Sequence, residues 1–434
     1  MLTMLSIESI IYCTNIILIY VISFKVEQMI KREMYLDQIR KITGTDFIKV
    51  IIGLRRCGKT SLLKSIMEDL QNQGINKKNI IYISFELVEY KNIFTSEQLD
   101  ETVLNLTKNL DGKVYLLFDE IQQVESWEKS INSYRVSFDC DIYITGSNSK
   151  LLSNELATLL AGRYIKINLY PFSFKEVLQY RQEIDNVKLD NESVKEQFNQ
   201  YLLFGGMPGL LPIRDDDTKV NALQDIYDSI IVHDILSRYT INEIDLFKRF
   251  SHYLMNSTGQ TFSKTSITNY LKSENKRTTR NTISNFTDYL KDSLFCKMVR
   301  RQDILGKKIL KTEEKYYLTD QGFHHALVDN NNNWLGRILE NVVFNELVRR
   351  GYSVKIGKIR NKEIDFVCEK HDNKIYVQVA YLLSSPEAIE REFSPLIDVP
   401  DKYDAYVLSM DEFDMSQNGI KHKNIIDFLL DDEI

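Results

Sequence analysis

From Met29 onward, segments with helical spacing of apolar residues alternate with short runs that are apolar throughout. Residues 29–42 and 96–110 predict amphipathic helices, the second capped by Ser96, because their apolar positions recur every three or four residues. Short apolar runs that predict buried parallel strands lie at 47–52, 80–85, 114–118, 141–145 and 164–169. This alternation predicts an α/β fold built on a parallel sheet.

The pattern changes between residues 241 and 330. Three helical segments follow one another, the second capped by Ser263 and the third by Thr278 or Thr279. Two strands joined by a basic loop come next, at 295–301 and 315–319. Three helices and a hairpin predict a winged helix-turn-helix, a fold used for binding the major groove of DNA.

Residues 5–24 form an apolar stretch long enough to span a bilayer as a helix. Polar residues interrupt this stretch, and no Lys or Arg precedes it. Met29 opens a sequence typical of the start of an α/β domain. We therefore interpret residues 1–28 as a segment upstream of the true start, and a membrane anchor is the alternative.

The composition is ordinary for a soluble globular protein, with 43% hydrophobic and 27% charged residues. A chain of 434 residues is long enough for two to four domains. The net charge of −6 restricts any nucleic-acid binding to a local basic face. The five cysteines form no Cys-x-x-Cys pair, which argues against structural zinc and a disulfide framework and favours a reducing cytoplasm.

The candidate chemistry begins directly after the strand at 47–52, where the sequence has the phosphate-loop spacing Gly-x4-Gly-Lys-Thr. The residues expected to contact a nucleotide are Gly53, Leu54, Arg55, Arg56, Cys57, Gly58, Lys59, Thr60 and Ser61. In such a loop backbone N–H groups surround the phosphates, Lys59 reaches the β- and γ-phosphates and Thr60 ligates Mg²⁺. Strand, glycine loop and helix occur in the required order, so the sequence predicts binding of ATP with Mg²⁺.

The apolar strand at 114–118 runs directly into Asp119 and Glu120. We expect Asp119 to hold the magnesium ion through water and Glu120 to act as general base toward the attacking water. The alternative is a strand that merely ends in a charged loop. The phosphate loop upstream, with one further strand between, favours the catalytic interpretation and the additional-strand class of P-loop ATPases. The next strand ends at Ser147 and Asn148, and either could sense the γ-phosphate.

Five segments together resemble one family: GLRRCGKTSLL, LLFDEIQQVESW, DIYITGSNSKLLS, LAGRYIKINLYPFSFKEVL and FGGMPGL. It is the family of bacterial and archaeal AAA-like P-loop ATPases with a C-terminal domain of unknown function, and the resemblance covers roughly residues 29–434. It implies an ATPase core with a helical lid over residues 29–240, in which Pro208 lies near the nucleotide base. It also implies an ATP-dependent switch or motor.

The same resemblance gives Arg163 a role. An arginine just before the fifth strand often projects into the neighbouring subunit's site of AAA-type ATPases as an arginine finger, so Arg163 would stabilise the transition state there. That role requires a homo-oligomer. Pairing of Arg163 with a surface carboxylate is the alternative.

Residues 335–434 resemble the restriction-endonuclease-like α/β core with the pattern PD-(D/E)xK. Glu340 and Asp365 fit its acidic, magnesium-holding positions. The third acidic position is Gln378 and the lysine position is Ala380, so the activating cation is lost. Two lysines could substitute if the fold brings one close: Lys355 and Lys358. We expect a nuclease-like domain without cleavage, and solubilising charges are the alternative reading of the acidic residues.

Predicted partners depend on where the charges lie. DNA would be contacted by Arg277 and Arg280 at the start of the third helix, with Lys276 beside them, and by the wing residues Arg300, Arg301, Lys307, Lys308 and Lys311. Winged helices also dock proteins, so a protein partner is the alternative. The sequence thus predicts a cytoplasmic ATPase switch that repositions its C-terminal half. An ATP-gated nuclease and a non-hydrolysing ATP-dependent switch are the rival functions.

Overall fold

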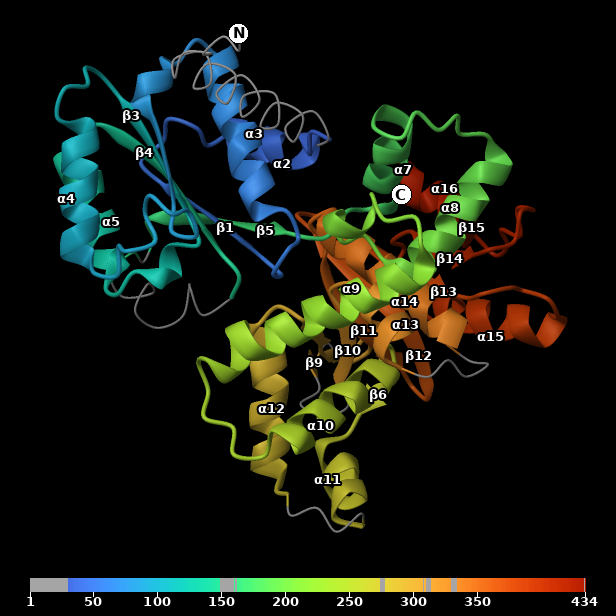
Figure 1. Ribbon diagram of the computed structural model, residues 1–434. Coiled ribbons are helices and arrows are strands. Elements are labelled where there is room, and N and C mark those ends of the chain that lie inside the picture. The colour runs from blue at the N-terminus through green and yellow to red at the C-terminus, as the bar shows by residue number, and fades with distance from the viewer. Residues whose placement is uncertain are drawn as a thin grey trace, which may run out of the picture.

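The computed structural model describes residues 30–148, 160, 162–273, 278–306, 308–309, 314–328, 334–432 and 434, and the predictions for residues 1–28 lie outside this range. It contains one parallel sheet, a small sheet beside three helices, and a large mixed sheet (Figure 1). Within the described ranges, no helix has the length and apolar character needed to cross a membrane.

The first sheet is entirely parallel, as predicted. Its strands are β1 (Ile48–Gly53), β2 (Ile80–Ser84), β3 (Val114–Asp119), β4 (Cys140–Gly146) and β5 (Tyr164–Leu169), in the spatial order β2-β3-β4-β1-β5. β4 separates β1 from β3, which is the arrangement of the additional-strand class. Because parallel strands end at the same edge, Gly53, Asp119 and Gly146 meet there.

Helices cover both faces of this sheet because the side chains of each strand alternate in direction. On one face, α2 (Glu33–Arg40) and α3 (Lys59–Asn72) pack with Ile51, Leu117 and Tyr143. On the other face, α4 (Ser96–Thr107) and α5 (Trp127–Ser137) pack with Val50 and Phe118. The cap of α4 is Thr95, one residue before the predicted Ser96, because Thr95 forms a capping box with Gln98.

Further helices connect this sheet to the rest of the chain. These are α7 (Phe174–Glu183), α8 (Asn191–Phe204), α9 (Asp216–Ser229) and the π-helix η5 (Ile230–Leu236), with short 3-10 turns η1 (Lys77–Asn79), η2 (Ile121–Gln123) and η4 (Pro208–Leu210). η5 continues α9 directly, so one helical path leads from this region to the next segment.

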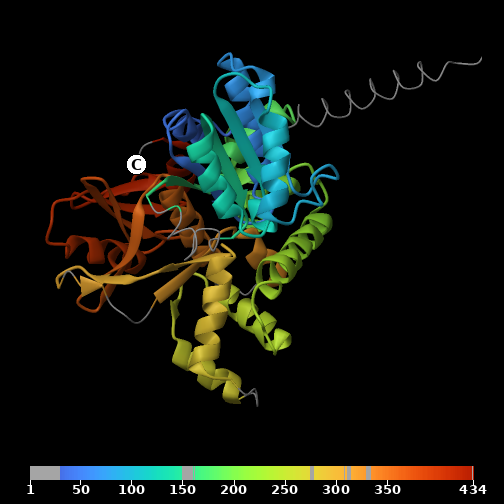
Figure 2. The same ribbon diagram turned by 90° about the vertical axis from the view of Figure 1, so that its left-hand side faces the viewer.

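That segment contains α10 (Ile244–Asn256), α11 (Lys264–Ser273) and α12 (Arg280–Asp292), which project away from both large sheets (Figures 1 and 2). Thr279 caps α12, as one of the two predicted alternatives has it. The small antiparallel sheet pairs β6 (Thr261–Phe262), β10 (Glu314–Leu318) and β7 (Cys296–Val299), with β10 in the middle. Helix α13 (Gly322–Leu327) follows.

The large sheet has the order β15-β14-β13-β12-β11-β8-β9. Its strands are β8 (Arg301–Asp303), β9 (Lys308–Ile309), β11 (Ser353–Ile359), β12 (Lys362–Lys370), β13 (Asn373–Val379), β14 (Ala405–Ser409) and β15 (Lys421–Asn424), and its helices are α14 (Trp334–Arg349), α15 (Pro386–Ile397) and α16 (Ile425–Leu430). The predicted strand 295–301 is therefore split, because the chain leaves the small sheet at Arg300 and pairs with the edge of β11. The large sheet thus crosses the predicted boundary at residue 330.

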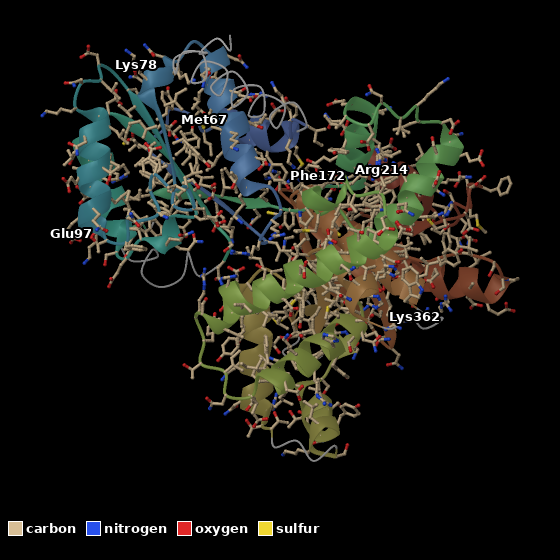
Figure 3. All side chains as sticks on the ribbon, in the orientation of Figure 1. Met67, Lys78, Glu97, Phe172, Arg214 and Lys362 are labelled. Carbon is tan, nitrogen blue, oxygen red and sulfur yellow. The ribbon has the colours of Figure 1, made fainter. Side chains whose placement is uncertain are left out.

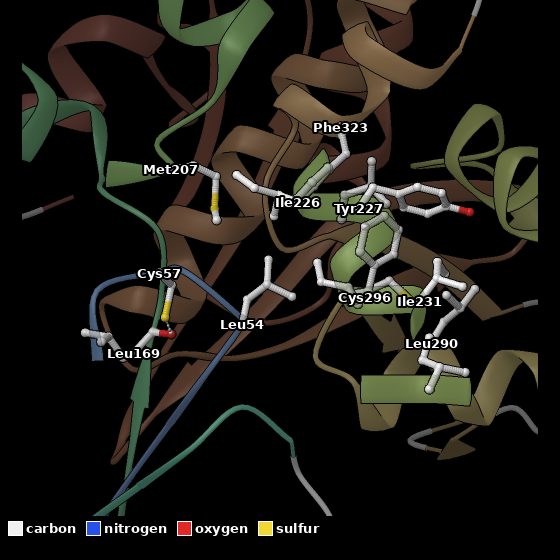
Figure 4. Packing of buried hydrophobic residues seen from close by; sticks show 14 of the residues in the cluster. Leu54, Cys57, Leu169, Met207, Ile226, Tyr227, Ile231, Leu290, Cys296 and Phe323 are labelled. Atoms are coloured by element: carbon white, nitrogen blue, oxygen red, sulfur yellow. Dashed lines mark hydrogen bonds between the residues drawn. The ribbon is translucent and has the colours of Figure 1, made fainter. Parts of the chain in front are cut away.

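The phosphate loop is anchored in a core that reaches across these segments. Leu54, Cys57 and Leu169 belong to the same buried cluster as Met207, Ile226, Ile231, Leu290 and Phe323 (Figure 4). The phosphate loop therefore shares one close-packed core with α9, η5 and α12.

Candidate functional site

The loop after β1 has the backbone that phosphate binding requires. At Gly53 a Cβ atom would lie 2.5 Å from the Leu169 carbonyl oxygen and 2.6 Å from the Cys57 Sγ, so only glycine fits. Gly58 has φ +102° at the start of α3, a conformation that favours glycine. Cys57 is fully buried against Leu169, and burial raises the pKa of its thiol, so it packs the loop and is not a nucleophile.

Lys59 and Glu120 form a buried pair at the mouth of this loop. The Lys59 Nζ lies 3.1 Å from the Glu120 Oε1 and donates to the carbonyls of Gly53 and Leu54 at 3.2 and 3.4 Å. Burial favours protonated Glu120, yet Lys59, a hydrogen bond from Gln122 and the charge of Arg55 hold its pKa below the usual range. Glu120 is therefore an ionised carboxylate.

Thr60 and Asp119, the two residues predicted to hold the metal ion, contact each other. The Thr60 hydroxyl donates to the Asp119 Oδ2 at 2.7 Å, and Asp119 is almost fully buried. Two partners that the sequence did not reveal hold this carboxylate. Thr145 donates to the Asp119 Oδ1 at 2.6 Å and accepts the Glu120 N–H at 2.9 Å, and the Tyr82 hydroxyl donates to Oδ2 at 3.1 Å. Thr145 ends β4 beside the end of β3, so a register prediction could have found it.

A cavity of about 520 Å³ opens over the loop. Its lining includes Arg55, Arg56, Gly58, Lys59, Thr60 and Ser61 together with Glu120. It also includes Pro208, which the resemblance placed near the nucleotide base, and the unpredicted Ile30, Arg32, Phe172, Tyr180 and Pro212. Cationic and hydroxyl groups beside apolar and aromatic side chains within one cavity suit a nucleoside triphosphate. The residues present therefore fit ATP with Mg²⁺.

A second cavity of about 570 Å³ shares Arg55 and Glu120 with the first. It is lined also by Ser147 and by Asp234 of η5. Asp234 is 1% exposed; its Oδ1 accepts from the Ser147 hydroxyl at 2.7 Å, and its Oδ2 lies 3.9 Å from an Arg55 nitrogen. The Asn148 side chain points to the same residue, donating to the Asp234 carbonyl at 3.4 Å. Ser147 and Asn148, the two candidates for sensing the γ-phosphate, thus both donate hydrogen bonds to Asp234 of η5.

Arg163 lies at the opposite edge of the parallel sheet. Its carbonyl accepts from the N–H of Ile48, where β1 begins, whereas the phosphate loop follows the other end of β1. Its side chain donates to the amide oxygen of Asn132 at 3.0 Å, in place of the surface carboxylate considered above. Arg163 therefore does not reach its own site, and its action on a neighbouring copy stays a prediction.

Only some of the predicted DNA-contacting residues can be placed. Arg280 is exposed at the start of α12, and Arg300 is exposed after β7. Arg301 is only 11% exposed and binds Glu363 at 2.6 Å, because β8 lies within the large sheet, so its assignment to the wing was wrong. The side chains outside the described range are those of Lys276, Arg277, Lys307, Lys308 and Lys311. Contact with DNA stays a prediction.

In the C-terminal region, α14 and β12 bring Glu340 and Asp365 together around a lysine. This lysine is neither of the two proposed substitutes, since Lys355 pairs with Glu369 at 2.8 Å and, among the described residues, Lys358 forms no ion pair with the cluster. It is Lys315 of β10, whose Nζ lies 3.0 Å from the Glu340 Oε1. No local motif marks Lys315, because it comes from the small sheet.

Comparison with known proteins agrees with this geometry. Residues 45–178 match a family model described as an AAA domain, and residues 195–333 match a domain of unknown function. An uncharacterized protein of Haemophilus influenzae is 40% identical over 404 residues, covering 93% of this chain and 99% of the relative. The chain belongs to the AAA-like P-loop ATPase family. An uncharacterized protein of Methanocaldococcus jannaschii is also similar, at 35% identity over 80% of this chain and 77% of its own length.

Similarity to solved structures is low. Orc1 of Aeropyrum pernix, in complex with DNA, covers 70% of this chain and 93% of its own, with 11% identity and a TM-score of 0.32. AMPPCP-bound DnaA of Aquifex aeolicus covers 61% and 90%, with 16% identity and a TM-score of 0.32. Scores this low carry no argument about function. The AAA-domain match itself includes the phosphate loop, Asp119-Glu120 and the strand end at Ser147.

Proposed function

We propose that this AAA-like ATPase binds ATP with Mg²⁺ and hydrolyses it, with Glu120 as general base. Two contacts beside one cavity carry the proposal. The Thr60 hydroxyl lies 2.7 Å from Asp119, and the Lys59 Nζ lies 3.1 Å from Glu120. Thr60 and Asp119 would hold the metal ion, whose charge would neutralise that of the phosphates. Arg55, at the boundary of the two cavities, is placed to add positive charge at the terminal phosphate.

The three N–H donors of Lys59 are occupied by Glu120 and by the carbonyls of Gly53 and Leu54. To contact the phosphates, Lys59 would have to give up one of these partners, and we infer that it leaves Glu120. Loss of Lys59 raises the pKa of Glu120, because Lys59 is the main group that lowers it against the effect of burial. The carboxylate then becomes a stronger base at the moment when substrate is bound.

ATP binding and phosphate release, measured on the purified chain and on Lys59→Met, test this function. We expect the wild type to bind ATP and to release phosphate, and the variant to lose both activities, because the central cation of the phosphate site is removed. Lys64→Met, on an exposed position of the same helix, is the matched control and should behave as the wild type. Equal phosphate release by Lys59→Met and Lys64→Met would contradict the proposal.

We also propose that the nucleotide state reaches the C-terminal half through Asp234. This carboxylate connects Arg55 of the phosphate loop and Ser147, the residue after β4, to η5, and the chain continues from η5 into α10. π-helical turns are frequent at functional sites. If Arg55 turns toward the terminal phosphate, Asp234 loses a cation in a buried place where burial already raises its pKa. Arg238, 3.8 Å from the Asp234 Oδ1, is then the cation that remains, and we expect η5 to rearrange toward it and to move α10.

Hydrogen exchange tests this route. In the wild type, ATP should change exchange within residues 230–256, and in Asp234→Asn this change should be largely lost while ATP still binds, because the amide keeps the shape but not the charge. The control is Asp228→Asn, an exposed carboxylate of α9 that pairs with Lys248. An ATP-induced change of undiminished size in Asp234→Asn would show that the signal travels elsewhere.

A further inference from the structure

Three carboxylates from two elements surround one buried ammonium group. Lys315 of β10 lies 3.0 Å from Glu340 of α14, 2.8 Å from Glu363 of β12 and 3.9 Å from Asp365 of the same strand. The Lys315 side chain is 5% exposed. A second cation, Arg301 of β8, binds the other oxygen of Glu363 at 2.6 Å.

The resemblance to PD-(D/E)xK domains implies a magnesium ion at this place, and the remaining oxygens do not fit one. The Gln378 Oε1 accepts from the Asp365 N–H at 3.2 Å, and its amide nitrogen donates to Glu392 at 2.9 Å. The Asp365 Oδ2 accepts from the Val379 N–H at 2.9 Å. Ala380 is buried in an apolar cluster. In the part of the chain that the structure describes, no group of three His, Cys, Asp or Glu residues is arranged to hold a metal.

We propose that the Lys315 ammonium permanently takes the place of the metal ion, so that this site fastens the small sheet to the large one and performs no metal-dependent cleavage. Lys315 would then be a structural counter-ion. The proposal is independent of ATP hydrolysis, because none of its residues lines the nucleotide cavity.

The electrostatics agree with a permanently charged lysine. Burial lowers the pKa of Lys315, but Glu340, Asp365 and Glu363 together raise it above its ordinary value. Burial and the nearby charge of Glu340 raise the pKa of Asp365 well above its usual range, and the charge of Lys315 opposes this rise. The Tyr317 hydroxyl donates to the Glu340 Oε1 at 2.6 Å and completes the shell of donors.

The strand that carries Lys315 cannot withdraw easily. Asn341 of α14 holds both backbone groups of Leu318, accepting its N–H at 2.7 Å and donating to its carbonyl at 3.0 Å. Asn345 donates to the same carbonyl at 2.9 Å. Because these bonds hold β10 to α14 directly beside the cluster, the small sheet and the C-terminal region should move as one body.

Divalent-cation binding by the nucleotide-free full chain tests the substitution of metal by lysine. Manganese is added to the wild type and to Lys315→Ala, and melting temperature and Mn²⁺ binding are followed. We expect Lys315→Ala to have a lower melting temperature than the wild type, because Glu340, Glu363 and Asp365 are left without their cation. Millimolar Mn²⁺ should restore part of the lost melting temperature. The wild type has the same phosphate loop and serves as the reference for Mn²⁺ bound elsewhere. Adding Glu340→Gln to Lys315→Ala should abolish the regained stability.

If the variants fold without added cation, two outcomes would overturn the proposal. The first is a wild type that Mn²⁺ stabilises, or that cleaves plasmid with Mg²⁺ or Mn²⁺, when Glu340→Gln abolishes this stabilisation or cleavage. Either result would mean that the site holds a metal beside Lys315. The other is a Lys315→Ala variant that gains nothing from Mn²⁺. If Lys315→Ala does not fold without a divalent cation, refolding in Mn²⁺ must recover the folded protein. The double variant Lys315→Met/Glu340→Gln must then fold without Mn²⁺, because the charges of Lys315 and Glu340 are both removed. Failure of both recoveries also contradicts the proposal.

Discussion

Glu120→Gln is expected to lower the rate constant of ATP hydrolysis by about 10²–10⁴-fold, the usual contribution of a positioned general base. The glutamine keeps the size of the side chain and its contact with Gln122 but cannot accept a proton from water. ATP affinity should not fall, and we expect it to rise, since Glu120 no longer competes with the phosphates for Lys59, 3.1 Å away. Single-turnover phosphate release and ATP titration separate the two effects.

The control for this substitution is Glu125→Gln, an exposed carboxylate five positions further along the same segment. It should leave both the rate and the affinity unchanged. A Glu120→Gln variant that hydrolyses ATP at the wild-type rate would remove Glu120 as the base, and a variant with weakened ATP binding would contradict the proposed exchange of Lys59 between carboxylate and phosphate.

Those parts of the site that follow from local chain geometry could be predicted from the sequence. The phosphate loop needs glycine at fixed positions after a strand, so Gly53, Gly58 and Lys59 mark it within a few residues. Asp119 and Glu120 follow an apolar strand whose direction is fixed by the parallel sheet. The α/β fold and the order of strands and helices were predicted for the same reason.

The remaining parts depend on contacts between segments far apart in the chain. Thr145 meets Asp119 only because β4 lies beside β3, and Asp234 meets Ser147 across 87 positions. Lys315 reaches Glu340 because β10 packs on α14. The sequence showed that the lysine position of the nuclease pattern is Ala380, but it could not show that a lysine from β10 lies beside the acidic residues. β8 leaves the predicted hairpin because an edge strand of another sheet accepts it. Such pairings depend on tertiary packing, which local patterns do not encode.

The buried arginine behind the phosphate loop gives the largest expected effect on stability. Arg32 is bound bidentately by Glu176 at 2.7 and 2.8 Å, and it donates to the carbonyls of Tyr170 at 2.7 Å and Cys57 at 3.4 Å. Its guanidinium also stacks over Phe172, which lies where the parallel sheet meets the C-terminal half (Figure 3). One side chain thus connects the loop, the cap of α7 and the Phe172 ring that lines the cavity.

Arg32→Ala should lower the free energy of unfolding by about 3–5 kcal/mol, the cost of leaving a buried carboxylate without its partner. The matched control is Arg40→Ala. Arg40 also contacts carboxylates, those of Glu33, Asp37 and Asp69, but it is 36% exposed, so its loss should cost at most about 1 kcal/mol. Urea unfolding of the two variants and the wild type measures the difference.

The pH dependence distinguishes a lost ion pair from lost packing. Burial would raise the pKa of Glu176, but Arg32 lowers it below the ordinary value, so the pair stabilises the fold at neutral pH and this contribution is lost as pH falls through the folded-state pKa. In Arg32→Ala the carboxylate keeps its burial and loses its partner, so its pKa rises and protonation relieves the strain in mild acid. The stability gap to the wild type should therefore narrow between neutral pH and about pH 4. A gap of constant size over this range would mean that Arg32 acts by packing alone, and the charge-based account of this contact would be wrong.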